Sequence, residues 1–190
     1  MAKALPPPKS CTGVPMMVSK IGALCAATLL SVSAPAMAKD AAINDAQIAH
    51  IAYTADQIDV DAGQQALKIS RKPDVRAFAE TMVRDHTSVN KQALALVHRL
   101  HVTPQANPTS AALTAEASKA HQRLSSLKGA AFDHAYLQNE VAYHGEVNKA
   151  LRDTLIPDAK NPELKSLLES GLTLFTEHQK HAEMLLKQLR

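Results

Sequence analysis

The stretch that decides the fold is VRAFAETMVRDHTSVNKQALALVHRL, residues 75–100. Along it, one set of side chains recurs every three or four positions, which is the spacing of one face of an α-helix. Seven members of the set are apolar and one, near the middle, is a histidine: Val75, Ala79, Met82, His86, Val89, Ala93, Val97 and Leu100. A helix with such a stripe is stable when the stripe is buried, so the stretch predicts a helix that faces a core.

The pattern continues on both sides of this stretch, and proline marks two helix starts, at Pro73 and Pro162. Helices are predicted over 44–69, 73–101, 130–155 and 162–189, with a short helix over 113–127 and a loop over 102–112. Two tight hairpins joined by one long connection predict an all-α, ferritin-like four-helix bundle whose long crossover carries a short extra helix. A plain up-and-down bundle with a disordered 102–112 loop is the alternative.

The composition excludes several classes of function. Both cysteines of the 190 residues, Cys11 and Cys25, lie before residue 39, and all nine histidines lie after it. Residues 39–190 therefore offer no disulfide, thiolate metal site or cysteine nucleophile. Three of the 21 Lys and Arg residues precede residue 39, so 18 basic side chains balance 18 acidic ones in 39–190. This neutral charge, with 3% aromatic residues and no Trp, argues against a nucleic-acid partner.

Residues 16–38 read MMVSKIGALCAATLLSVSAPAMA, which is the pattern of a signal peptide. Lys20 precedes a short apolar run, and Ala36-Met37-Ala38 forms a cleavage site. Residues 1–38 are thus predicted to be a signal peptide with an extended leader over 1–15, and translation starts at Met1, Met16 or Met17. A lipoprotein cut at Cys25 is disfavoured by the bulky Leu24. The predicted product, 39–190, is one domain without a transmembrane span, exported to the periplasm or associated with the outer membrane.

Each long apolar stripe carries a polar side chain near its middle. Residues equidistant from the turn of an antiparallel hairpin lie at one level, within about 2–3 Å for an offset of one or two residues. Asp59 and His86 are nearly equidistant from the turn at 70–73, and His144 and His178 from the turn at 157–162. The four are predicted to meet at one level of the bundle axis, with Glu140 one helical turn from His144 on the same face.

Imidazole and carboxylate groups are ligands of transition metals. A carboxylate-bridged di-iron site uses four carboxylates and two histidines in Glu-x-x-His pairs, and the sequence contains no such pair. The histidine-rich set predicts one ion of Zn, Fe, Mn or Cu, with Asp59, His86, His144 and His178 as ligands and Glu140 as a fifth ligand or a supporting group. The alternative is a structural cluster in which Asp59 pairs with a protonated histidine.

Other polar residues are expected to have structural roles. Asp85 points about 100° away from its neighbour His86 and is expected at the surface. His181 is expected beside the stripe. Tyr143 is expected to pack in the core, and Asp133 to form a structural hydrogen bond.

Several segments resemble one family. These are KPDVRAFA over 72–79, MVRDH over 82–86, and GAAFD over 129–133 followed by Tyr136, His144 and His178. Over about residues 45–185 the chain resembles the exported bacterial ferritin-like family known as domain of unknown function 4142, often described as a predicted outer-membrane protein family. The resemblance implies a ferritin-like bundle with a signal peptide, and no established activity.

Two functions are therefore considered. The first is an exported bundle that binds one transition metal ion in its mid-core. The second is a non-catalytic envelope stress or assembly protein that contacts an envelope partner through its surface, with a purely structural polar cluster. An oxidase or peroxidase would need an open coordination position and a substrate channel, neither of which the sequence shows, so no catalytic residue is predicted. The oligomeric state is left open.

Overall fold

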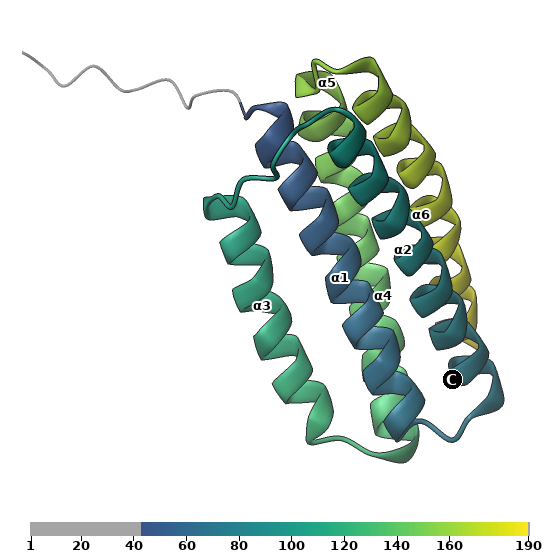
Figure 1. Cartoon of the computed structure of the whole chain (residues 1–190). Helices are drawn as coiled ribbons and strands as arrows, with labels where there is room; N and C mark the ends of the chain where they lie inside the picture. Colours follow the sequence, from purple (N-terminus) through teal and green to yellow (C-terminus); the bar gives the residue numbers. More distant parts are fainter. Residues whose placement is uncertain (1–42, 190) are drawn as a thin grey trace, which may run out of the picture. The chain divides into compact units, whose positions relative to one another are not determined.

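The computed structural model describes residues 43–189, which form five long helices (Figure 1). These are α1 (Asp45–Ile69), α2 (Pro73–Arg99), α3 (Pro108–Ser125), α4 (Gly129–Ala150) and α6 (Pro162–Gln188). A π-helical turn, η1 (Leu151–Leu155), and the short α5 (Ile156–Asp158) link α4 to α6. The predicted signal peptide, 1–38, lies outside the described residues. Among the described helices, none combines the length and the apolar composition needed to span a membrane.

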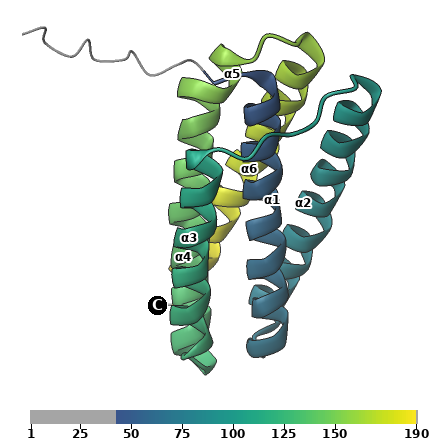
Figure 2. The same cartoon turned by 60° about the vertical axis from the view of Figure 1, so that its left-hand side comes forward.

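Four helices enclose the core, and the fifth packs against their outer side while contributing the buried Leu124 to it. Helices α1, α2, α6 and α4 follow one another around the bundle, and α3 packs against α1 and α4 (Figures 1 and 2). The crossover, which is the connection from α2 to α4 that contains α3, runs alongside α1. Near the start of α1, Gln105 N donates to the Ala46 carbonyl at 2.9 Å. Near the end of α1, Gln65 Nε2 donates to the His121 carbonyl at 2.9 Å. The predicted all-α helical bundle is confirmed.

The extra helix is longer than predicted. We expected a loop over 102–112 and a helix from 113, but α3 begins at Pro108. The Asn107 side chain accepts from Ser110 N at 3.0 Å, and the Ser110 hydroxyl accepts from Asn107 N at 3.2 Å. This reciprocal cap, followed by proline at the first helical position, is a strong helix start. It is the same Asn-Pro signal that starts α6 at residues 161–162.

The helix predicted over 130–155 is interrupted after Ala150. Its last residues form the π-helical turn η1, which places both Leu151 and Leu155 in the core. Pro157 follows closely and has no N–H to donate to the carbonyl of Asp153, so an uninterrupted α-helix is disfavoured there. The turn lies about two helical turns beyond His144.

The core contains two apolar clusters. The turn cluster lies toward the α1–α2 turn and is built around Phe78, Met82, Phe132, Tyr136 and Leu137, all inaccessible to solvent. The α5 cluster lies toward α5 and includes Ile48, Leu96, Leu151, Leu168 and Phe175. Because apolar burial stabilises in proportion to area, these two clusters hold the bundle together.

The helices α1 and α2 pack closely at Gly63. A Cβ atom added there would lie 2.9 Å from Val83 Cγ2 and 3.0 Å from the Ala79 carbonyl oxygen. These distances are too short for real carbon contacts, so any larger residue would separate the two helices.

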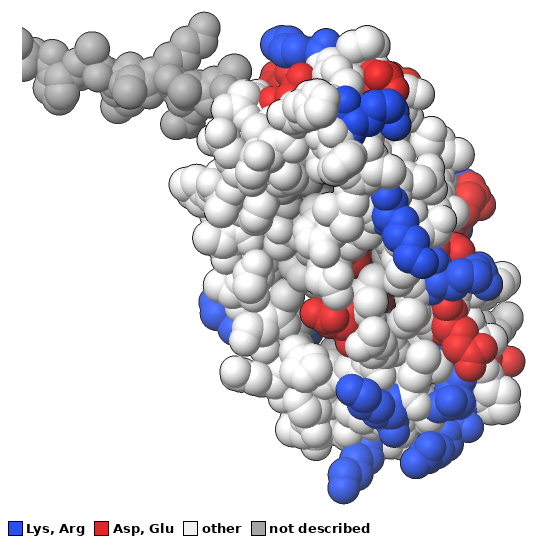
Figure 3. Space-filling view, viewed as in Figure 1, with Lys and Arg blue, Asp and Glu red and all other residues white. Residues whose placement is uncertain are grey.

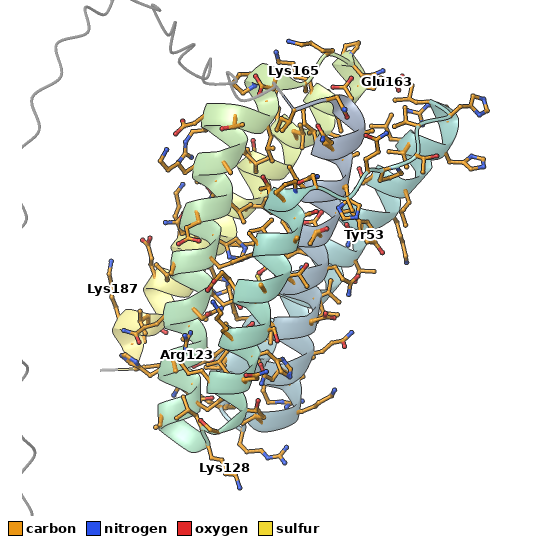
Figure 4. All side chains as sticks on the ribbon, turned by 90° about the vertical axis from the view of Figure 1, so that its left-hand side faces the viewer. Tyr53, Arg123, Lys128, Glu163, Lys165 and Lys187 are labelled. Carbon is orange, nitrogen blue, oxygen red and sulfur yellow. The ribbon has the colours of Figure 1, made fainter. Side chains whose placement is uncertain are left out.

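Charged side chains lie mostly outside. Uncharged side chains cover most of the face over α1 and α3, while Lys and Arg gather toward the α1–α2 turn (Figure 3). Glu163 and Lys165 lie at one end of the bundle and Lys128 at the other (Figure 4). Glu163 pairs with Arg99, so this exposed contact links α6 to α2. Exposed pairs of this kind contribute little to stability.

Candidate metal centre

Between the two apolar clusters lies a polar layer, which we call the mid-core layer. All four core helices contribute to it, and no member is more than 4% exposed. Its members are Asp56 and Asp59 from α1, His86 from α2, Glu140 and His144 from α4, and His178 from α6. The structure thus brings together all five residues that the sequence predicts to meet. Their role as metal ligands stays a prediction.

The three histidines form a triangle. Their ring centroids are separated by 5.6 Å for His86 and His144, 5.2 Å for His86 and His178, and 5.6 Å for His144 and His178. One ring nitrogen of each lies within 4.8 Å of those of the other two. Three imidazoles from three helices therefore converge on one point near the bundle axis.

Each histidine is held through one of its two ring nitrogens. His86 Nδ1 lies 2.7 Å from Asp56 Oδ1, His144 Nδ1 lies 3.0 Å from the carbonyl oxygen of Glu140, and His178 Nε2 lies 3.0 Å from Asp85 Oδ2. A carbonyl or carboxylate oxygen accepts a hydrogen bond, so the ring nitrogen facing it carries the proton. The three contacts therefore fix the orientation of each ring and the tautomers of His144 and His178. Burial raises the pKa of Asp56, so the tautomer of His86 follows from its contact while that carboxyl is ionised.

The opposite nitrogen of each ring has no protein partner. Within residues 43–189, no group forms a hydrogen bond with His86 Nε2, His144 Nε2 or His178 Nδ1, and all three atoms are buried. In the tautomers just derived, each of these nitrogens carries a lone pair. A buried acceptor without a partner destabilises a fold by about 1–3 kcal/mol. One nitrogen held by an oxygen and the other left free is the pattern of a metal-binding histidine.

Two carboxylates adjoin the triangle. Asp59 Oδ2 lies 3.5 Å from His86 Nε2, close to the separation of about 3.3 Å between neighbouring ligands of a tetrahedral ion with bonds of 2.0–2.1 Å. Glu140 Oε2 lies 3.6 Å from His144 Nδ1, the nitrogen that already donates to a carbonyl. Asp59, Glu140 and His144 form a second group whose ligand atoms lie within 4.8 Å of one another. Asp59 therefore approaches the triangle through His86, but its ligand atoms group with Glu140 and His144 rather than with all three histidines.

Burial keeps the three rings neutral. It lowers the pKa of His86 to about 4 and, together with the neighbouring His86 ring, the pKa of His178 to about 4. The pKa of His144 falls to about 3, because of burial and then because of the other two rings. All three imidazoles are therefore uncharged at neutral pH, so their lone pairs are available to a cation. The alternative of Asp59 paired with a protonated histidine is disfavoured.

The carboxyl groups of the layer shift in the opposite direction. Burial raises the pKa of Glu140 to about 8. Burial, with repulsion from Glu140 and Asp56, raises the pKa of Asp59 well above its usual range. A bound cation would favour the ionised form of both groups. The layer as a whole therefore presents neutral nitrogen donors and carboxyl groups whose charge a cation would stabilise.

Sequence reasoning missed two members of this arrangement. Asp85 lies at the edge of the surface and pairs with the exposed Arg84 at 2.8 Å, as expected, but because α6 packs against that flank of α2 it also accepts from His178, which was missed. Asp56, which holds His86, precedes Asp59 by three positions. That spacing places Asp56 on the same helix face, and it was the signal available in the sequence.

The remaining polar residues have the structural contacts expected of them. Tyr143 is largely buried, and its hydroxyl donates to the Ala55 carbonyl at 3.1 Å. Asp133 accepts from the Ser70 hydroxyl at 2.5 Å. The ring of His181 packs edge-on against Phe78, at a centroid distance of 5.3 Å.

Comparisons with known proteins place this fold in a family. The sequence pattern of the domain of unknown function DUF4142 matches residues 30–185, so the chain belongs to this family. A comparison with curated proteins finds no match. A crystal structure of the "putative secreted protein DUF305" from Streptomyces coelicolor is similar, with a TM-score of 0.65 and 11% identity over 75% of this chain and 91% of that one. At this identity the similarity concerns the fold alone.

Proposed function

We propose that this protein is an exported, ferritin-like four-helix bundle that binds one transition metal ion in its mid-core layer. His86, His144, His178 and Asp59 are the ligands, and Glu140 is a fifth ligand or a supporting group. The long crossover that carries α3 along the bundle supports the ferritin-like description. The signal-peptide pattern supports export to the periplasm or the outer membrane, as does the secreted description of the Streptomyces coelicolor protein. We assign no reaction to the ion.

The observation that carries the proposal is the pairing pattern of the three histidines. Each ring is oriented by an oxygen on one side and presents a buried, unpaired lone pair on the other. Because the three nitrogens lie within 4.8 Å of one another, a point equidistant from them lies at most about 2.8 Å from each, whereas Zn–N bonds are 2.0–2.1 Å. An inward movement of less than about 1 Å would close the site. Among Zn, Fe, Mn and Cu, the nitrogen-rich donors favour Zn, Cu or Fe over Mn.

The test is the metal content of the mature protein, purified without a histidine tag. We compare wild type, His86→Ala/His178→Ala, and the control His121→Ala/His134→Ala, which removes two exposed histidines. Wild type and control are expected to hold one ion per chain, and added metal is expected to raise their Tm. The core variant is expected to show neither effect. Should the alanine pair fail to fold, His178→Gln alone tests the same ligand.

The opposite result has a clear meaning. Wild type that contains no ion, and whose Tm is unmoved by Zn, Fe, Mn or Cu, would refute the proposal. The mid-core layer would then be a structural polar cluster. That outcome would favour the alternative of an envelope protein that acts through surface contacts with a partner.

A further inference from the structure

A cavity of about 40 Å³ lies in the α5 cluster, beside the mid-core layer. All four core helices line it, and Asp56 is the single polar residue in its wall. A lone water molecule needs about 10–15 Å³ measured in this way, so the cavity has room for a larger guest. The cavity is partly open to solvent, since Ala52 and Ala93 in its wall are partly exposed, and water that enters such apolar walls loses hydrogen bonds. The cavity is therefore suited to a small apolar molecule.

Small side chains make this space. The wall includes Ala49, Ala52 and Ala55 of α1, Ala93 of α2 and Gly171 of α6. Protein interiors are close-packed and contain few voids larger than a water molecule. Leucine at Ala52 or Ala93 would add the volume needed to fill the space. The cavity therefore follows from the residue types at these positions.

Phe175 separates the cavity from the histidines. Its ring lines the cavity and stacks on His86, with ring centroids 4.7 Å apart and planes inclined by 17°. Gly171 gives the ring its room, because a Cβ atom there would lie 3.2 Å from Phe175 Cε2. The other connecting wall is Asp56, which holds His86 Nδ1. Two side chains that both touch His86 thus form the boundary between the cavity and the metal site.

We propose that the cavity takes up an apolar diatomic molecule, of the class of dioxygen and nitric oxide, and passes it by Phe175 to the ion bound by the three histidines. A polar or charged substrate would lose its hydration in the apolar chamber without replacement. Zinc held by three imidazoles and one carboxylate would be closed at four ligands, whereas iron(II) held by imidazole and carboxylate ligands keeps open positions for a further one, so the delivery step requires iron. The delivery step rests on the proposed metal binding, whereas uptake into the cavity does not. The step is reversible coordination and breaks no covalent bond.

Xenon tests the cavity, because it is apolar and binds in apolar cavities. We compare metal-free wild type, Ala93→Leu, and the control Ala95→Leu, which makes the same change at an exposed position of the same helix. The probe is the chemical shift of ¹²⁹Xe during titration. Wild type and Ala95→Leu are expected to bind xenon, and Ala93→Leu is expected to lose it. Absence of xenon binding in wild type would overturn the proposal.

Nitric oxide tests delivery. It is mixed with the same three proteins and with Phe175→Leu after loading with iron(II), and the nitrosyl complex is followed by stopped-flow absorbance and electron paramagnetic resonance. Ala93→Leu is expected to slow the association of nitric oxide with the iron at least tenfold. Phe175→Leu is expected to accelerate it, because a smaller side chain then separates the cavity from the histidines. Equal rates in wild type and both variants would overturn delivery and reduce the cavity to a packing void. If wild type takes up xenon but binds no metal, the proposed metal binding and the delivery step are both wrong. The proposed uptake of apolar molecules into the cavity is then still supported.

Discussion

The turn cluster and the mid-core layer lie at the same depth but differ in chemistry. In the turn cluster, the Phe132 and Tyr136 rings stack at 6.0 Å, and Phe78 meets Tyr136 edge-on at 6.2 Å. In the mid-core layer, equally buried residues leave three imidazole nitrogens unpaired. The first arrangement stabilises the fold through apolar burial, although the Tyr136 hydroxyl also lacks a hydrogen-bond partner, whereas the second leaves several buried polar atoms without one and so destabilises the fold. Stability and the proposed function therefore reside in different layers of one core.

The largest effect is expected in the turn cluster. Phe132→Ala should lower the free energy of unfolding by about 3–5 kcal/mol, because it removes a fully buried ring and leaves a cavity. Urea denaturation of the metal-free protein measures this. The affinity of the folded protein for metal should be unchanged. A variant that keeps its stability but loses its metal would refute the separation of the two layers.

The second effect concerns Glu140, whose pKa of about 8 lies far above the usual value near 4.5. Below pH 4.5 the carboxyl is protonated in both the folded and the unfolded chain. Between pH 4.5 and 8 the unfolded chain releases a proton that the folded chain keeps, so stability falls as pH rises. Glu140→Gln cannot ionise. In the metal-free protein it should therefore be more stable than wild type at pH 8, by an amount on the order of a few kcal/mol.

The pH profile separates this explanation from a packing effect. The advantage of Glu140→Gln should shrink steadily as pH falls toward 4.5, and saturating metal should reduce it at pH 8, because a cation favours the ionised carboxyl. Denaturation curves at several pH values, with and without metal, provide the measurement. A stability gain of Glu140→Gln that does not change with pH would show that the raised pKa of Glu140 is not its cause.

A smaller effect is expected from the oxygens that hold the histidines. Asp56→Asn and Asp85→Asn keep an acceptor but remove the charge, and such changes typically weaken metal binding 10–100-fold. The Asp56 change should have the larger effect, because Asp85 is 19% exposed and partly screened by water. Competition with a chelator measures both affinities, and the exposed Asp61→Asn serves as the control. Equal affinities in all three variants would contradict a supporting role for these oxygens.

The smallest effect is expected at Tyr143, at the edge of the layer. Tyr143→Phe removes the hydrogen bond to the Ala55 carbonyl and should lower stability by about 0.5–1.5 kcal/mol. Metal affinity should stay within twofold of wild type in the same chelator competition. A loss of tenfold or more would place Tyr143 inside the functional layer.

Much of the helical architecture was predictable from local patterns. The stripe around His86 and the prolines at residues 73 and 162 located α2 and α6, because periodicity and capping act within a few residues along the chain. The symmetry of Asp59 and His86 about their turn predicted their common level. The early start of α3 at Pro108 was also encoded locally, in the Asn107 cap, but was missed.

The supporting contacts of the site were less accessible to such reasoning. Asp85 lies off the apolar stripe of its helix, and its contact with His178 depends on how α6 lies against α2. Which nitrogen of each histidine is held depends on ring orientations that neighbouring helices impose. Helix periodicity specifies the face on which a side chain lies, but it does not specify its partner on another helix.

By itself, the sequence determined which residues form helices, which face of each helix is buried, and that polar side chains interrupt four apolar stripes near one level. These features follow from the 3.6-residue period and from local capping. The tertiary structure alone decided that three histidine nitrogens remain unpaired, that Asp56 and Asp85 orient two of the rings, and that a cavity lies behind Phe175. These features arise where four helices meet, because there the packing of distant segments, rather than local spacing, sets each distance.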